Sequence, residues 1–170
     1  MQTPGETSRL AGGLAPALIE TMNAFGTSVW SSLSEDREAF SVEQAAEVRR
    51  EATAFFFHAL DVVAFQRLGP EGRTDFMDTI IKYAAPRTRE ELDEFFSLLN
   101  DRQRDYSEYR QLFAKPGAAY KGTLCWEFAK LISARVGERN PARVALVNIN
   151  ALGVLEVLGA TFASLERPAP

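Results

Sequence analysis

Apolar residues recur at three- and four-residue steps along most of the chain, which is the period of α-helices rather than of strands. The clearest example lies between Ser41 and Gly69. Ser41 and Gln44 fit an S-x-x-Q capping box, and Gly69 followed by Pro70 is typical of a helix end. The second half of this stretch is apolar in most directions, as expected of a helix buried among other helices. We therefore predict a central helix over residues 41–68.

The same periodicity, together with capping residues, predicts five further helices. Proline suits the first turn of a helix, whereas threonine and asparagine suit the position before it. Such signals occur at Pro16, Pro70, Thr88, Thr123 and Asn140 with Pro141. They place the helices at residues 16–33, 70–85, 88–113, 123–136 and 141–166.

These elements predict an all-α fold, in the form of a single-domain bundle of about six helices. Helices 41–68 and 141–166 are expected to be central because they are the most apolar. The domain is predicted to cover residues 14–167. Residues 1–13, which are rich in Gly, Thr and Ser, are predicted to form a flexible N-terminal tail.

The predicted last helix, 141–166, is apolar on nearly every side. Its length raises the question of a membrane span. However, Asn148, Asn150 and Glu156 interrupt it, and neither flank carries a basic cluster. A buried core helix, or one face of a homodimer, fits this pattern better, so a membrane partner is not expected.

Composition narrows the classes of function. The chain has 170 residues, 46% of them hydrophobic and 25% charged, which is typical of a globular protein. A net charge of −4 gives no electrostatic attraction for nucleic acid. The single cysteine, Cys125, cannot form an intrachain disulfide, and no secretory signal is visible. We expect a cytoplasmic protein.

Candidate chemistry begins with the only histidine, His58. On a helix, Glu47, Glu51, His58 and Asp61 fall along one side. One interpretation makes His58 a proton carrier or ligand, tuned by the carboxylates. The other makes it a core histidine, or part of a solvated edge, with a carboxylate as its hydrogen-bond partner.

Two further groups allow both a functional and a structural interpretation. Arg102 and Tyr106 lie on an apolar stripe, where they form either an anion-binding cluster or packing with an ion pair inside the bundle. Trp126 and Glu127 place an aromatic wall beside a carboxylate, as in many small-molecule pockets and also in ordinary packing.

Several chemistries are excluded by what the sequence lacks. One histidine and no Glu-x-x-His motif exclude a di-iron site, and one cysteine is too few for structural zinc. No phosphate-binding glycine loop is present. We therefore predict no metal and no cofactor. No catalytic residue can be assigned, and the sequence does not decide whether the protein is an enzyme.

Two hypotheses follow. The first is a non-enzymatic helical protein that acts by association, with itself as a homo-oligomer. The alternative is a small-molecule-binding protein or small enzyme with an interhelical polar pocket around His58 and Arg102. The ligand-binding candidates for that pocket are His58, Asp61, Arg102, Tyr106, Trp126 and Glu127.

Overall fold

The computed structural model describes residues 4–34, 41–88, 92–109, 111–112 and 120–165. Within these residues the chain forms five helices and no strand, so the predicted all-α class is confirmed. The helices are α1 (Pro4–Leu33), α2 (Val42–Thr88), α3 (Leu92–Tyr106), α4 (Leu124–Arg135) and α5 (Pro141–Leu165).

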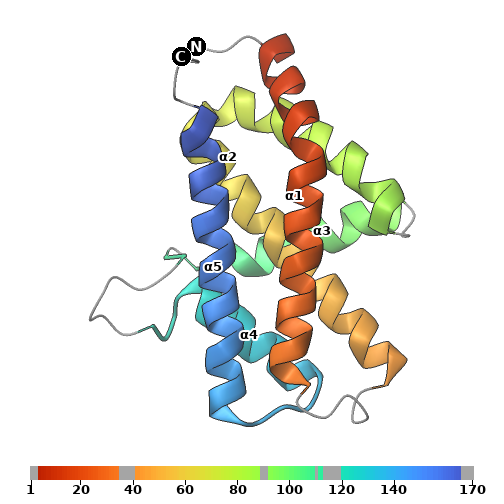
Figure 1. The fold of residues 1–170 in the computed structure, drawn as a ribbon, viewed down its shortest axis with the longest axis vertical. Helices are drawn as coiled ribbons and strands as arrows, with labels where there is room; N and C mark the ends of the chain where they lie inside the picture. The colour runs from red at the N-terminus through yellow and green to blue at the C-terminus, as the bar shows by residue number, and fades with distance from the viewer. Residues whose placement is uncertain (1–3, 35–40, 89–91, 110, 113–119, 166–170) are drawn as a thin grey trace.

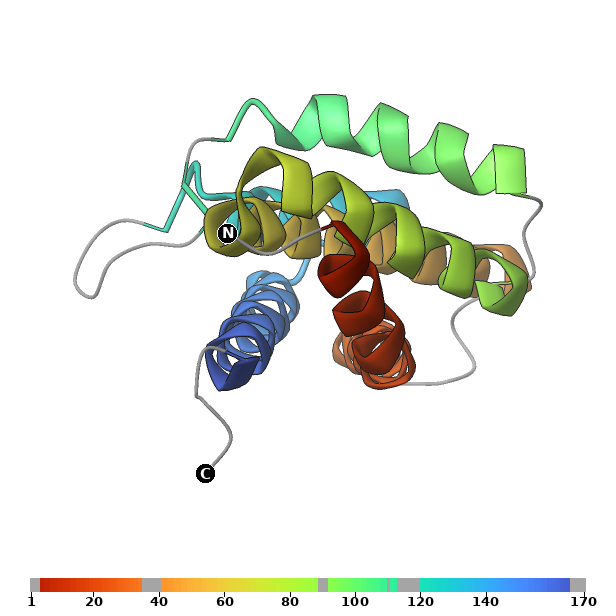
Figure 2. The ribbon, with the colours of Figure 1, turned by 90° about the horizontal axis from the view of Figure 1, so that it is seen from above.

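The helices are arranged in layers. Helices α1 and α5 run antiparallel, side by side, and form one layer (Figure 1). Helix α2 lies behind them, and α3 packs on the far side of α2 (Figure 2). Helix α4 contacts α5 and α2. Helix α2 is therefore the element that the others share.

Helix α2 begins where the sequence predicts, and it bends where the sequence predicts the end of one helix and the start of the next. The Gln44 backbone N–H donates to the Ser41 hydroxyl at 3.2 Å, and the Gln44 side chain accepts from the Ser41 N–H at 2.9 Å. Gly69 has φ 71° and ψ −179°, a conformation open essentially only to glycine. Pro70 then starts a second helical segment, so the two helices predicted at 41–68 and 70–85 are the two arms of one bent element.

The bend changes the helix count from about six to five. The second arm also extends through Pro86 to Thr88, beyond the predicted end at residue 85. Ala84 and Ala85 are buried in the core, and this packing outweighs the local preference of a residue that precedes proline.

The first arm of α2 carries the centre of the core. Phe55, Phe56 and Phe57 are all buried, as predicted for the apolar half of this helix. Phe55 stacks on Phe128 of α4 with ring centroids 4.3 Å apart. Phe57 meets Phe95 of α3 edge-to-face at 5.3 Å. Phenylalanines that are close together in the sequence thus pack α2 against two different helices, α3 and α4.

The predicted flexible tail is wrong for residues 4–13, which form the first turns of α1. Thr7 and Ala11 are buried there, and Thr7 lies beside Gly72 of the second arm of α2. Packing against that arm orders a glycine-rich segment whose local sequence favours a loop. Pro16, predicted at a helix start, lies inside α1 with its ring exposed.

The helix predicted at 88–113 is shorter than expected. Helix α3 ends at Tyr106, where the Ser107 hydroxyl donates to the Arg104 carbonyl at 2.8 Å and the Tyr109 N–H donates to the Tyr106 carbonyl at 3.1 Å. These local bonds replace the helical ladder. Glu91 of the predicted capping box and the predicted end at Phe113 lie outside the described residues.

The last two helices begin where predicted. The Trp126 N–H donates to the Thr123 hydroxyl at 3.4 Å, and the Ala142 N–H donates to the Asn140 side chain at 2.9 Å. Among the described helices, α5 alone has, over Pro141–Ala163, the length and apolar composition of a membrane span. The core helices of soluble proteins share both properties, so this observation leaves location open.

Candidate functional site

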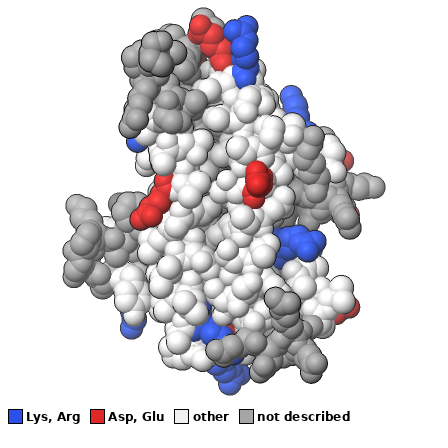
Figure 3. Space-filling model, in the orientation of Figure 1, with Lys and Arg blue, Asp and Glu red and all other residues white. Residues whose placement is uncertain are grey.

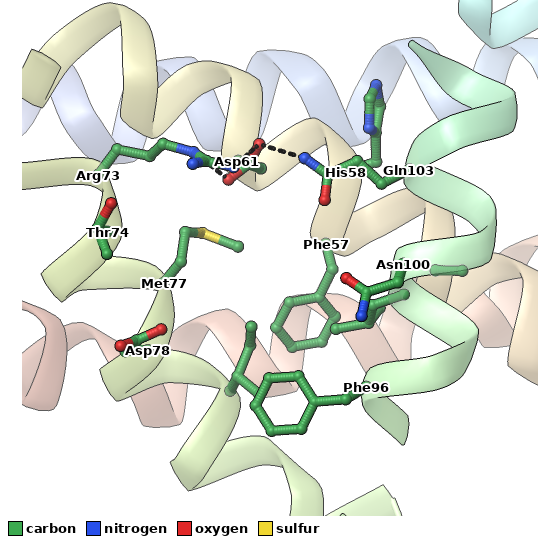
Figure 4. Close-up of a pocket in the computed structure, with 13 residues that line it drawn as sticks. Phe57, His58, Asp61, Arg73, Thr74, Met77, Asp78, Phe96, Asn100 and Gln103 are labelled. Carbon is green, nitrogen blue, oxygen red and sulfur yellow. Dashed lines mark hydrogen bonds and ion pairs between the residues drawn. The ribbon is translucent and has the colours of Figure 1, made fainter. Parts of the chain in front are cut away.

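A cavity lies between the two arms of α2 and helix α3 (Figure 4). Its volume is about 150 Å³. Apolar side chains, among them Phe57, Met77 and Phe96, surround the open centre, and polar groups from both helices lie around them. The bend at Gly69 creates this space, because it turns the second arm of α2 away from the line of the first.

An ion pair joins the two arms of α2 at the edge of the cavity. Arg73 donates from Nε to Asp61 Oδ1 at 2.6 Å and from Nη2 to Oδ2 at 2.8 Å. The Gln103 amide of α3 donates to the same carboxylate at 3.4 Å. Hydrogen bonding to Asp61 raises the pKa of Arg73. Arg73 therefore stays charged, and its two hydrogen bonds to Asp61 join the two arms across the bend.

His58 lines the cavity, but its ring is directed toward Tyr106 and not into the open centre (Figure 4). The ring centroids of His58 and Tyr106 are 5.3 Å apart. Burial lowers the pKa of His58, although the nearby charge of Asp61 opposes this effect. The carboxylate of Asp61 is bound to Arg73, and Nδ1 of His58 has no hydrogen-bond partner among the described residues. The predicted carboxylate partner of a core histidine is therefore absent from this part of the chain.

Arg102 is held by a carboxylate of α2. Its Nε lies 2.8 Å from both oxygens of Glu51, and its Nη2 lies 2.5 Å from Oε1. Arg135 of α4 reaches the same carboxylate at 3.2 Å and also pairs with Glu47. The hydrogen bond to Glu51 raises the pKa of Arg102. This arrangement matches the structural interpretation of Arg102, an ion pair inside the bundle.

Tyr106 lies beside this ion pair and is buried. Burial, the largest influence, raises the pKa of its hydroxyl, and the charge of Glu51 acts in the same direction. The hydroxyl has no hydrogen-bond partner among the described residues. Its ring also packs edge-to-face on Phe55 at 6.1 Å. Tyr106 is therefore a neutral core residue.

Trp126 and Glu127 lie elsewhere. The ring of Trp126 packs on Tyr120, with centroids 4.5 Å apart. Glu127 accepts from Lys130 Nζ at 2.7 Å and from the Gly122 N–H at 3.3 Å. Neither residue lines the cavity.

The six predicted site residues therefore occupy three places. His58 and Asp61 line the cavity, Arg102 and Tyr106 lie next to it around Glu51, and Trp126 and Glu127 lie near the start of α4. The fold therefore does not bring all six residues into a single site.

The structure adds cavity residues that the sequence did not indicate. Arg73 and Asp78 come from the second arm of α2, and Asn100 comes from α3. The position of Arg73 and Asp78 depends on the angle of the bend at Gly69, and that of Asn100 on the packing of α3 against α2, neither of which a local sequence signal specifies.

A second candidate surface lies on α5. Five exposed positions and the half-buried Gly153 follow steps of four, three, four, three and four residues, and Val157 beside them is also exposed. We call this set of six the α5 stripe: Ala142, Leu146, Ile149, Gly153, Glu156 and Ala160. Leu146 is 48% exposed and Ile149 is 59% exposed. A Cβ placed on Gly153 would contact nothing, so the stripe has an open gap there.

The surroundings of the α5 stripe are nearly uncharged. In Figure 3 the surface over α1 and α5 is mostly white, with isolated acidic side chains. Only 28% of the most apolar window of α5 is buried, although α5 packs on α1, α4 and α2. Sequence periodicity could not find the stripe, because a helix that is apolar on every side does not reveal which side stays exposed.

Among the described residues there is no group of three or more His, Cys, Asp or Glu side chains that could hold a metal ion. Compared with known proteins, the chain matches no family model, no curated protein and no solved structure. The function must therefore be argued from the cavity and from the α5 stripe.

Proposed function

We propose that this protein acts by association with a second copy of itself, as a homo-oligomeric and non-enzymatic helical protein that pairs through the α5 stripe. One observation carries the proposal: the most apolar helix of the chain is only 28% buried along its most apolar window. Leu146 and Ile149 project from it into solvent. Contiguous exposed apolar surface of this kind marks interaction sites in soluble proteins.

The spacing of the α5 stripe favours another helix as the occupant. Alternating steps of four and three residues are the repeat of helices that pack along a common seam. A lipid surface favours an apolar face flanked by basic residues, whereas the α5 stripe contains no basic residue and its one charge is the acidic Glu156.

The α5 stripe is complementary to itself when two copies pair antiparallel about residue 151. Ile149 of one copy then lies opposite Gly153 of the other, so a large side chain meets the open gap. Ala142 lies opposite Ala160. An isologous contact of this kind uses the same surface on both copies, so the assembly stops at a dimer.

Glu156 decides between the two directions. In a parallel pair the two Glu156 carboxylates would lie side by side in an apolar seam, where like charges repel. In the antiparallel pair they are ten residues apart along the axis, about 15 Å at 1.5 Å per residue. This distance exceeds the screening length of about 8 Å at physiological salt. The antiparallel pair therefore avoids the repulsion.

Sedimentation equilibrium over a range of concentrations tests the proposal. We expect the wild-type protein to form a dimer, and Ile149→Glu to raise its dissociation constant by at least about tenfold, because it places a charge at the centre of the seam. The matched control is Val42→Glu, which adds the same charge at an apolar position that is 82% exposed at the start of α2. This variant should dimerise as the wild type does.

A wild-type monomer at every concentration would overturn the proposal. Equal loss of dimer in both variants would assign the effect to net charge and not to the α5 stripe. Flotation with neutral lipid vesicles, abolished by Ile149→Glu, would instead identify the stripe as a membrane-contact surface.

A further inference from the structure

The charges around the cavity between α2 and α3 do not balance. Asp61 and Arg73 neutralise each other through their two hydrogen bonds. His58 is neutral at neutral pH because burial lowers its pKa. This leaves the carboxylate of Asp78, which is exposed and has no hydrogen bond or ion pair within the described part of the chain. Lys82, one turn further along α2, does not line the cavity.

A second polar group at the cavity is also without a partner. Asn100 of α3 is exposed, and its amide is directed toward the open centre (Figure 4). It has no hydrogen bond to any described residue, whereas its neighbour one turn on, Gln103, is bound to Asp61. An amide oxygen accepts hydrogen bonds, as does the Asp78 carboxylate. The two unpaired groups lie on opposite sides of the open centre (Figure 4), so we assign the cation to the Asp78 carboxylate, which carries the negative charge.

The size and lining of the cavity define the rest of the ligand. An enclosed apolar cavity of about 150 Å³ holds one benzene ring. The cavity here has that volume but is open to solvent on one side and has a mixed lining, so it encloses such a ring only in part. Phe57, Phe96 and Met77 provide an apolar wall. Aromatic faces also attract cations. A ligand that matches this site has one ring and a short arm that ends in a positive charge.

We propose that this cavity binds a small primary amine that carries a single apolar ring, with its ammonium group at Asp78 and its ring against Phe57 and Phe96. A carboxylate ligand is disfavoured because the one cation that lines the cavity, Arg73, is already neutralised by two hydrogen bonds to Asp61. This inference is independent of the proposed self-association, since the cavity lies on the side of α2 that faces α3 and away from α5.

The test uses three probes of similar size and different charge: benzylamine, benzyl alcohol and benzoate. Chemical-shift changes of backbone amides, followed during titration, report both the place and the affinity of binding. We expect millimolar binding of benzylamine with shifts in both arms of α2 and in α3, weaker binding of benzyl alcohol, and none of benzoate. Binding of benzylamine should weaken as salt is added, because the attraction at an exposed carboxylate is screened.

Two variants locate the charge that matters. Asp78→Asn should weaken benzylamine about threefold to fivefold, the range for an exposed ion pair, and leave benzyl alcohol unchanged. Asp75→Asn removes a carboxylate from the same arm outside the cavity and should change neither. Asn100→Trp places a large side chain at the mouth and should reduce binding of both probes.

Three results would overturn the proposal. Benzoate binding as tightly as benzylamine would make Arg73 the anchor. An equal effect of Asp75→Asn and Asp78→Asn would reduce the interaction to long-range charge. No shifts in α2 and α3 with any probe would show that the cavity takes no such ligand.

Discussion

Glu51 shows how single residues fix the arrangement of the helices. Its side chain is 1% exposed, and a carboxylate buried to this extent is stable only when it is paired and hydrogen-bonded. Arg102 of α3 and Arg135 of α4 supply these partners from two different helices. If Arg102 moved away, the buried charge would keep only the longer contact to Arg135, and weakening the pairing of a buried carboxylate is destabilising. This ion cluster therefore fixes α3 and α4 relative to α2.

His58 makes the stability of the fold depend on pH in a defined direction. Its pKa in the folded protein lies below the ordinary value of 6.5, which it regains on unfolding. The unfolded state therefore binds more protons between these two values. The contribution of neutral His58 to stability is complete above the ordinary pKa, and it is lost as the pH falls through the pKa of the folded protein.

We expect the wild type to lose stability relative to His58→Gln as the pH is lowered from about 8 to about 5, the interval in which histidine titrates. Urea unfolding of both proteins at several pH values measures the difference, and the other titrating groups, which the two share, largely cancel. A difference that stays constant with pH would contradict the lowered pKa. Tyr106, the ring next to His58, does not titrate in this interval because its pKa is raised.

At the scale of single helices, backbone conformation and packing give glycine opposite roles in α1 and α2. Gly69 adopts φ 71° and ψ −179°, which a side chain disfavours strongly. Gly13 lies in the regular, exposed part of α1, where a Cβ would contact nothing. The first glycine creates the bend, whereas the second only weakens a helix.

The same substitution should therefore change stability with opposite signs at these two positions. Gly69→Ala should destabilise the protein by about 1–3 kcal/mol, because it strains the bend that Asp61 and Arg73 close. Gly13→Ala should stabilise it by up to about 1 kcal/mol through helix propensity. Denaturant unfolding gives both values. A loss of stability with Gly13→Ala would argue against an ordered α1 in this region.

Helix ends were predictable from the sequence where the signal is local. The side chains at Ser41, Thr123 and Asn140 bond backbone groups two or three residues away, and each starts a helix where expected. Residues 4–13 were not predictable in this way. Thr7 and Ala11 are ordered by the second arm of α2, which lies far along the chain.

The same distinction between local signals and long-range packing applies to the candidate site. The sequence indicated that Arg102 on an apolar stripe needs a carboxylate, and the fold supplies Glu51, 51 residues away. It could not indicate that Asp78 and Asn100 border a cavity, because that depends on the bend at Gly69 and on how α3 packs against α2. That a buried charged residue requires a partner can be read from the residue itself, whereas the identity of that partner depends on tertiary packing.

At the scale of the molecule, α1 and α5 form an outer layer (Figure 2). The other helices pack on one side of this layer and leave its other side uncovered. The Asn150 amide of α5 donates to the Ser28 carbonyl at 3.2 Å and to the Ser32 hydroxyl at 2.8 Å on α1. Asn150 lies at the edge of the α5 stripe, so these bonds fix the rotation of α5. They keep Leu146 and Ile149 directed outward.

The proposed antiparallel pairing of α5 predicts a specific pattern of cross-links. Ala142 and Ala160 lie at opposite ends of the α5 stripe, and both are exposed. In an antiparallel pair each lies next to the other residue of the second copy, while two copies of Ala142 are 18 residues, about 27 Å, apart. A disulfide cannot form when Cα atoms are more than about 7 Å apart. The native Cys125 does not compete, because it is buried and its pKa is raised to about 12.

Ala142→Cys alone and Ala160→Cys alone should therefore remain uncross-linked on mild oxidation, whereas an equimolar mixture of the two should give a covalent dimer on a non-reducing gel. A parallel pair would give the reverse result, because each variant would then cross-link to itself. If Ile149→Glu were added to both variants, the dimer from the mixture should disappear, which ties the cross-link to the seam and not to random collision. Persistence of the cross-link in that background would show that the two cysteines meet without the α5 stripe and would remove the argument for antiparallel pairing.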